Sequence, residues 1–225
     1  MEDIKEVKDV KVKKRRAMTT RNVYDKKPGK PVVCNDAAIL RTLGDNASCG
    51  GMWLISGKEK NGKTSFALML AKSLASNHKV VYVSAEEETD DSFVAAMRRA
   101  GITVSDRIKW EEYLPFESII EQYSKVRTAD FIFIDNLTAY TDEVRRADIL
   151  KVKKSFPAGK TLVFVAHEEG NRPDPESALA VSKFAKIKFR VVSMNVMVTS
   201  RYANGGGNIV IDEDRKALFF GEVSR

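Results

Sequence analysis

Short, nearly continuous apolar runs recur along the chain, and longer segments with helical spacing of their apolar residues separate them. Val, Ile and Phe dominate these runs. Strands that are apolar on both faces are typical of parallel sheets that helices cover on each side. The pattern therefore predicts buried parallel strands at residues 52–56, 79–84, 131–135 and 160–166.

Helices are predicted where apolar residues recur every three or four positions. Asn35 or Asp36 is placed to cap the first of them. The predicted helices span residues 35–43, 65–74, 90–100, 118–126 and 143–154. Strands that alternate with helices in this way indicate an α/β domain with three layers.

The rhythm changes after residue 186, where short apolar runs follow one another without helices between them. Gly-rich and Asp-rich turns at residues 204–207 and 212–214 suit hairpins. The predicted strands are residues 186–191, 195–199, 208–211 and 217–220. The expected fold is thus a mostly parallel sheet that ends in antiparallel hairpins at the C-terminus.

The net charge of +7 is concentrated at the N-terminus. Residues 1–31 hold 11 Lys and Arg against 5 Asp and Glu, whereas the rest of the chain holds 27 against 26. We therefore expect a basic, flexible arm over residues 1–31 and one domain over residues 32–225. The arm is either a solvated tail or a segment that docks on a neighbouring subunit or on nucleic acid phosphates.

Nothing in the sequence favours secretion or a membrane. Cys34 and Cys49 do not make a disulfide framework or a metal set, and no apolar run approaches transmembrane length. The charged N-terminus is not a signal peptide. We expect a soluble, cytoplasmic protein without a membrane partner.

A phosphate-binding loop follows the first predicted strand. The residues from Gly57 to Thr64 match the pattern G-x-x-x-x-G-K-[ST], and a helix-forming segment comes directly after them. The two glycines permit a tight turn of backbone N–H groups, Lys63 would reach the β- and γ-phosphates, and Thr64 would ligate Mg²⁺. The expected contacts with ATP are Gly57, Lys58, Glu59, Lys60, Asn61, Gly62, Lys63, Thr64 and Ser65.

Polar residues at the ends of the other strands complete the candidate site. Asp135 ends an apolar strand, where a carboxylate can hold Mg²⁺ together with Thr64 or cap the next helix. Glu86 is the candidate catalytic base, with Glu87 as the alternative one residue on. His167 is the candidate sensor of the γ-phosphate, and no second His or suitable Cys supports a metal site there.

Two further expectations concern the surroundings of these strands. Residues 168–177 are polar and are expected to form a mobile loop after His167. His78, the other histidine, follows the first core helix and is expected to be a solvated residue at its C-terminus.

The phosphate loop, the segments 82–86, 131–135 and 164–167, and the closing hairpins together resemble the RecA-like ATPase superfamily. Within it, the chain is most similar to the DnaB helicase core and to RadA- and KaiC-like domains, and it also resembles small ATPases of phages and mobile elements. The resemblance implies that Glu86 is the catalytic glutamate, Asp135 the magnesium-linked aspartate and His167 the polar sensor. It also implies that Arg201 is an arginine finger for a neighbouring subunit, although Thr199 stands where the helicases usually have a lysine.

The resemblance implies an Mg²⁺-dependent ATPase of DNA replication or recombination. Such an enzyme would form a homo-oligomeric ring, a hexamer for instance, or a filament, and would associate with single-stranded DNA. The alternative is a KaiC-like regulatory ATPase that acts on protein partners. A small-molecule kinase fits less well, because the sequence has no arginine-bearing lid and no acceptor pocket, and its end is β-rich.

Overall fold

A nine-stranded sheet forms the centre of the protein in the computed structural model, which describes residues 17–85 and 89–220. Eight strands follow the order β3-β2-β4-β5-β1-β7-β8-β9, and β6 pairs with β5. The strands are β1 Gly51–Gly57, β2 Val80–Ser84, β3 Ile108–Glu111, β4 Phe131–Asp135, β5 Thr161–Glu169, β6 Arg172–Asp174, β7 Ile187–Val192, β8 Asn195–Ser200 and β9 Gly207–Val210.

The six strands from β3 to β7 in this order are parallel, whereas β8 and β9 continue the sheet in antiparallel pairing. The carboxyl ends of the parallel strands therefore meet at one edge, with Ser84 beside Asp135 and Gly57 beside both His167 and Val191. This confirms the predicted α/β fold with a mostly parallel sheet and antiparallel C-terminal strands.

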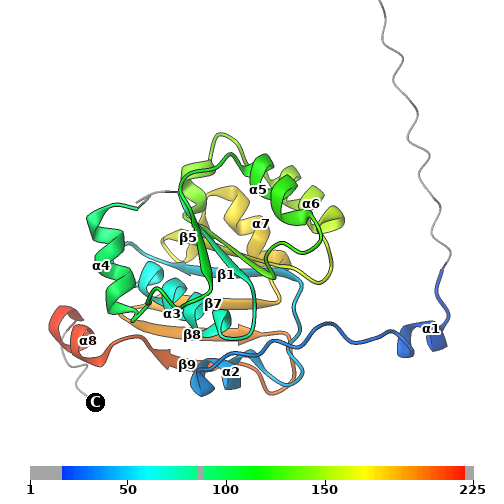
Figure 1. The fold of residues 1–225 in the computed structure, drawn as a ribbon, viewed down its shortest axis with the longest axis horizontal. Coiled ribbons are helices and arrows are strands. Elements are labelled where there is room, and N and C mark those ends of the chain that lie inside the picture. The colour runs from blue at the N-terminus through cyan, green and yellow to red at the C-terminus, as the bar shows by residue number, and fades with distance from the viewer. Residues whose placement is uncertain (1–16, 86–88, 221–225) are drawn as a thin grey trace, which may run out of the picture.

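Helices cover both faces of the sheet (Figure 1). Side chains of α2, α3 and α4 pack in one core cluster, and side chains of α5, η1, α6 and α7 pack in a second cluster on the opposite face. The helical elements are α1 Thr20–Tyr24, α2 Ala37–Leu43, α3 Lys63–Ala75, α4 Asp91–Arg99, α5 Phe116–Ser124, η1 Leu137–Tyr140, α6 Arg146–Ser155, α7 Glu176–Phe184 and α8 Glu213–Phe220.

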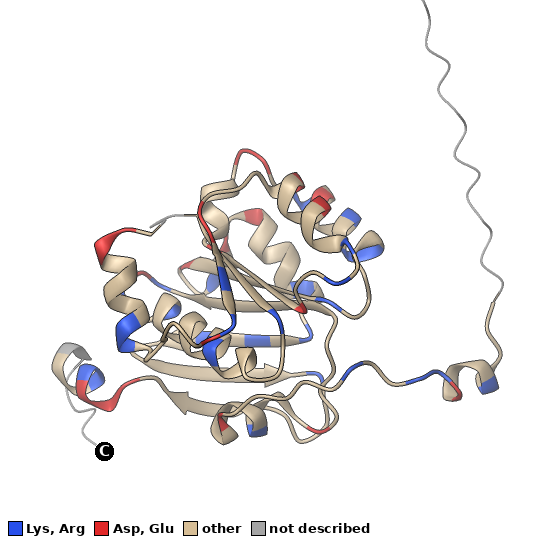
Figure 2. Ribbon diagram, in the orientation of Figure 1, with Lys and Arg blue, Asp and Glu red and all other residues tan. Residues whose placement is uncertain are grey.

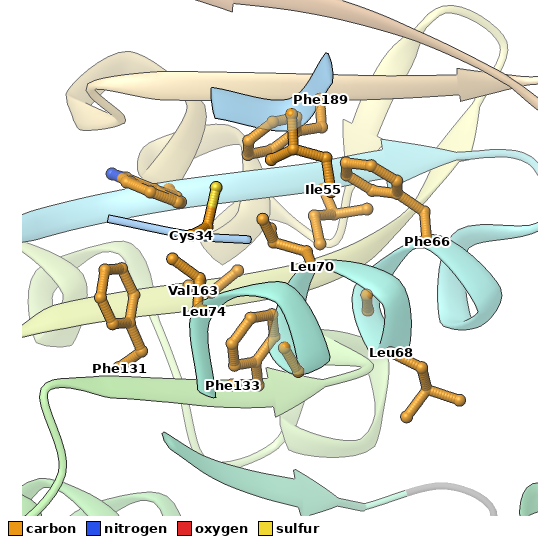
Figure 3. Close-up of a cluster of buried hydrophobic side chains, with 14 of the residues drawn as sticks. Cys34, Ile55, Phe66, Leu68, Leu70, Leu74, Phe131, Phe133, Val163 and Phe189 are labelled. Atoms are coloured by element: carbon orange, nitrogen blue, oxygen red, sulfur yellow. The ribbon is translucent and has the colours of Figure 1, made fainter. Parts of the chain in front are cut away.

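The core on the α3 side is dense with aromatic rings (Figure 3). Phe189 of β7 packs against Phe66 of α3 and Trp53 of β1, with ring centroids 5.1 and 6.0 Å apart. All three side chains are fully buried. Because α3 carries the phosphate loop at its N-terminus, this packing holds the loop at a fixed height above the sheet.

All five predicted core helices are present, with ends that differ by a few residues from the predicted ones. The helix predicted at 118–126 lies at Phe116–Ser124, because Phe116 is buried directly after Pro115 and begins the helix. Seven of the eight predicted strands are also present. The sequence analysis missed α1, β3, η1, β6 and α7, which are short or carry mixed polar and apolar positions.

The strand predicted at residues 217–220 is wrong, because these residues belong to α8. Asp212 caps this helix: its Oδ1 accepts the backbone N–H of Arg215 at 2.9 Å, and Glu213 and Asp214 lie in the first turn. An aspartate cap with acidic residues in the first turn stabilises a helix N-terminus. The acidic segment 212–214 is therefore a helix start and not a hairpin turn.

The mobile loop predicted at residues 168–177 is also wrong. β5 continues to Glu169, turns tightly at Gly170 with a φ of 61°, and pairs with β6 through Glu169 and Arg172. α7 begins directly afterwards, at Glu176. The polar residues of this segment therefore form a short hairpin that extends the central sheet.

His78 is buried, contrary to the expectation of a solvated residue. Its Nε2 accepts the backbone N–H of Val33 at 3.0 Å, and Phe131 packs against its ring. The pKa of His78 lies below its usual value, mainly because burial penalises the charged form and also because Lys30 is near, while Asp130 opposes the shift. His78 thus fastens the segment after the N-terminal arm to the core.

The chain from Ala17 to Pro28 lies outside the domain (Figure 1). All of these residues are exposed, and α1 buries none of its side chains. Lys30 contacts the domain, because its carbonyl oxygen accepts the backbone N–H of Cys49 at 2.8 Å and its Nζ donates to Oδ2 of Asp130 at 2.9 Å. Pro31 then bridges to Ser48, and Val32 is buried. Among the described residues, no helix combines the length and the apolar character needed to cross a membrane.

Candidate nucleotide site

The phosphate loop lies where the central strand of the sheet ends. β1 runs into Gly57 between its neighbours β5 and β7, and α3 begins six residues later at Lys63. The loop therefore lies above the carboxyl edge of the sheet, the position at which open α/β sheets bind ligands. This arrangement confirms the strand, loop and helix that the sequence predicts.

The loop needs glycine at its two pattern positions. Gly62 has a φ of 99°, and a Cβ atom there would lie 2.5 Å from Sδ of Met194. A Cβ atom on Gly57 would lie 2.4 Å from the carbonyl oxygen of Val191. Both approaches are shorter than real Cβ contacts, so a larger residue at either position would displace the loop from β7 and from the turn after it.

The N-terminus of α3 is built to receive an anion. Gly62 occupies its cap position without a side chain that could satisfy the first N–H groups, and α3 is thirteen residues long. The buried side chain of Lys63 adds a full positive charge in the first turn. Uncapped N–H groups, the helix dipole and a buried ammonium together fit the phosphates of a nucleotide.

The structure brings Lys63 and His167 together. Nζ of Lys63 donates to the carbonyl oxygen of Lys58 at 3.0 Å and lies 3.2 Å from Nδ1 of His167. Because an ammonium group only donates, Nδ1 is the acceptor in this pair, and a neutral imidazole then carries its proton on Nε2. The predicted sensor thus lies in direct contact with the phosphate-loop lysine.

Asp135 lies buried at the end of β4. Its Oδ2 accepts a hydrogen bond from the Tyr82 hydroxyl at 2.5 Å. Carboxylate and hydroxyl oxygens are the ligands that Mg²⁺ prefers, and Mg²⁺ needs only one or two protein ligands beside phosphate and water. Asp135 and Thr64 therefore fit the ion, and in the described parts of the chain no group of three His, Cys, Asp or Glu side chains forms a metal cage.

The candidate catalytic base Glu86 and its alternative Glu87 lie outside the described residues.

A cavity of about 600 Å³ opens beside the phosphate loop. Its floor is the start of α3, including Thr64 and Ser65. The rest of its wall comes from three other elements and was missed by the sequence analysis: Ser92, Ala96 and Arg99 of α4, Met194 after β7, and Arg215 of α8. Arg99 and Arg215 add positive charge to the site from segments that no nucleotide motif marks.

The turn between β7 and β8 braces the phosphate loop. Oδ1 of Asn61 accepts the backbone N–H of Ser193 at 2.6 Å, and the Asn61 carbonyl oxygen accepts that of Met194 at 3.2 Å. Ser193 and Met194 have φ values of 48° and 61°, which non-glycine residues rarely adopt. The contact with Asn61 and the packing of Met194 over Gly62 accompany this strained turn.

An ion pair between a buried carboxylate and a partly exposed guanidinium lies behind the loop. Nε of Arg190 in β7 donates to both carboxylate oxygens of Glu168 in β5, at 3.1 and 3.0 Å. Ser56 of β1 donates to the same carboxylate at 2.8 Å. This network ties together the three strands whose ends support the phosphate loop. The carboxylate in β5 and the guanidinium in β7 were the sequence signal that could have revealed it.

Arg201 lies at the opposite end of the sheet. β8 runs antiparallel to β7, so the end of β8 at Ser200 pairs with Ile187, whereas the phosphate loop lies level with Val191. The exposed guanidinium of Arg201 donates from Nη2 to the carbonyl oxygen of Lys183 at 2.9 Å. Arg201 therefore does not reach the phosphate loop of its own chain, and its role as a finger in a neighbouring site stays a prediction.

The strand order, the antiparallel C-terminal strands and the phosphate loop between strand β1 and helix α3 define a protein with the RecA-like fold. A solved structure agrees with this. The flagellar accessory protein FlaH from Methanocaldococcus jannaschii superposes with a TM-score of 0.54 at 16% sequence identity, over 80% of this chain and 92% of the FlaH chain. No protein-family model and no curated protein matches the sequence. At this identity the likeness establishes the fold alone.

Proposed function

We propose that this protein binds and hydrolyses ATP with Mg²⁺ and works as a RecA-like ATPase in DNA replication or recombination. The observation that carries the proposal is the phosphate loop: a buried lysine next to His167, at an uncapped helix N-terminus above the carboxyl edge of the sheet. Backbone N–H groups and a buried cation at one point suit a triphosphate.

Each predicted side chain has a task in this reaction. Lys63 neutralises charge on the phosphates. Thr64 and Asp135 would hold Mg²⁺, which would supply positive charge to the phosphate oxygens. Glu86 orients the attacking water and takes its proton. His167 touches Lys63, so a change at the γ-phosphate can pass from the lysine to β5.

The proposed active site is completed between subunits. Arg201 is exposed and lies far from its own loop, as a residue that acts on a neighbour must. A guanidinium suits this task because it is always charged and presents a planar set of donors. A homo-oligomer, as a ring or filament, would bring Arg201 of one subunit to the phosphates of the next.

The DNA-directed role rests on the helicase-like order of the motifs and on the basic N-terminal arm. We therefore expect single-stranded DNA to stimulate hydrolysis. The test is ATP turnover with and without single-stranded DNA over a series of salt concentrations, because phosphate contacts weaken steeply with salt. Turnover that DNA does not change at any salt concentration would refute the DNA-directed role and favour the regulatory alternative.

A further inference from the structure

The edge of the sheet opposite the phosphate loop carries a row of charged residues. Each of four neighbouring strands is preceded by one: Arg107 before β3, Lys79 before β2, Asp130 before β4 and Lys160 before β5. The strand register places the first residues of these strands side by side. At the usual spacing of strands, the row spans about 14 Å.

This row lies in a hollow surface that we name the strand-start groove. It consists of two adjoining cavities, of about 470 and 460 Å³, which share Lys79, Arg127 and Thr128. Six basic residues line the groove, against two acidic ones: Lys30, Lys79, Arg107, Lys109, Arg127 and Lys160 against Glu111 and Asp130. The groove thus has a net charge of about +4, within a domain that is otherwise almost neutral.

The two acidic residues already have partners inside the protein. Glu111 accepts the Tyr123 hydroxyl at 2.7 Å, and Oδ2 of Asp130 accepts Nζ of Lys30 at 2.9 Å and the backbone N–H of Lys79 at 3.1 Å. By contrast, Arg107, Lys109 and Arg127 are exposed and form no ion pair with any residue that the structure describes.

The basic surface continues beyond the groove. The exposed arm joins the domain at Lys30, which belongs to the groove, and carries Arg21, Lys26 and Lys27. Figure 2 shows Lys and Arg segments on the side of the sheet that faces away from α4 and α8, and others along the arm. The positive charge therefore follows an extended path and does not surround a single point.

We propose that the strand-start groove binds the phosphate backbone of a single-stranded nucleic acid. An elongated row of exposed Lys and Arg suits a chain with one negative charge per nucleotide. An acidic protein partner is less suited, because stable protein interfaces centre on buried aromatic or aliphatic anchors. Among the described residues that line the groove, Val126 is the one large hydrophobic side chain with high exposure.

The proposal rests on the DNA-directed function above and adds the surface that holds the strand. It places DNA at the edge of the sheet away from the site of hydrolysis. The test is binding of a labelled oligothymidylate without nucleotide, measured by fluorescence anisotropy over a salt series. Because no ATP is present, this binding test is independent of hydrolysis. A protein without ATPase activity could still bind the strand through the groove, and an active ATPase could fail to bind it.

The test variant is Arg107→Gln/Lys109→Gln/Arg127→Gln, which removes three exposed cations and no ion pair between described residues. The matched control is Arg41→Gln/Arg98→Gln/Lys188→Gln, which removes three exposed cations from α2, α4 and β7. The logarithm of the association constant falls linearly with the logarithm of the salt concentration. In the test variant this slope should become shallower by about 2, at about 0.7 for each lost contact with a single strand. The control should keep the wild-type slope.

Three results would overturn the proposal: no binding by the wild-type protein at low salt, equal losses in both variants, or equal affinity for an acidic peptide of the same charge. Thermal unfolding of each variant checks the fold. If the triple variant unfolds, the single variants Arg107→Gln and Arg127→Gln take its place. Each should make the slope shallower by about 0.7.

Discussion

Replacing Arg190 with methionine should destabilise the protein by about 2 kcal/mol, because it leaves the buried carboxylate of Glu168 without its cation. Removing one partner of a fully buried pair typically costs about 3–5 kcal/mol. The Glu168 side chain is 3% exposed, but that of Arg190 is 37% exposed. Water therefore already screens part of the attraction, so we expect about 2 kcal/mol and not the cost of a fully buried pair.

A double-mutant cycle separates the ion pair from the loss of packing. Glu168→Gln keeps an acceptor for the Ser56 hydroxyl, and in the double variant Glu168→Gln/Arg190→Met neither charge remains. The double variant should therefore be more stable than Arg190→Met, with a coupling free energy of about 1–2 kcal/mol. Urea unfolding followed by circular dichroism measures all four proteins under the same conditions.

The matched control is the pair between Glu121 on α5 and Lys125, which directly follows this helix. The side chains of Lys125 and Glu121 are 65% and 81% exposed, and their charged atoms lie 3.7 Å apart. Lys125→Met should cost at most about 0.5 kcal/mol. If Arg190→Met cost no more than this control, or if the cycle showed no coupling, the pair behind the phosphate loop would not be a stabilising contact and the reasoning would be refuted.

The remaining predictions concern catalysis and pH. Lys63→Ala should abolish ATP binding or hydrolysis while the fold persists, and normal turnover in this variant would remove the assignment of the phosphate loop. If the site is shared, specific activity should rise with protein concentration. Arg201→Ala should then lose turnover by several orders of magnitude but keep its nucleotide affinity. A mixture of Arg201→Ala with Lys63→Ala should regain some activity, and no rescue on mixing would exclude the shared site. Burial lowers the pKa of His78, so the unfolded state gains a proton more readily and stability should fall as the pH drops below about 6.5. His78→Gln should flatten this fall in urea unfolding between neutral and acidic pH, and an unchanged pH profile would contradict the assignment.

The sequence by itself determined the elements whose signals are local. Apolar strands such as Phe131–Asp135 are continuous in the chain, so a short stretch of sequence reveals them. A glycine pattern between a strand and a helix likewise indicates a phosphate-binding loop from neighbouring residues alone. These features sufficed to predict the α/β fold and the phosphate loop. His167, predicted to follow its strand, lies within β5 and pairs in register with Gly57. The prediction at residues 217–220 failed because the local signal was ambiguous. An Asp-rich segment can begin either a hairpin or a helix, and here it begins α8.

Only the tertiary structure decided which distant residues meet. Strand order and register bring Lys63 to His167 and join Ser56, Glu168 and Arg190, although the loop and β5 are about a hundred residues apart. A charge within an apolar strand has no visible partner until the neighbouring strand is known. The strand-start groove has the same origin: three of its basic residues, Lys79, Arg107 and Lys160, precede separate strands. The parallel sheet places these strand starts at one edge because parallel strands share one direction.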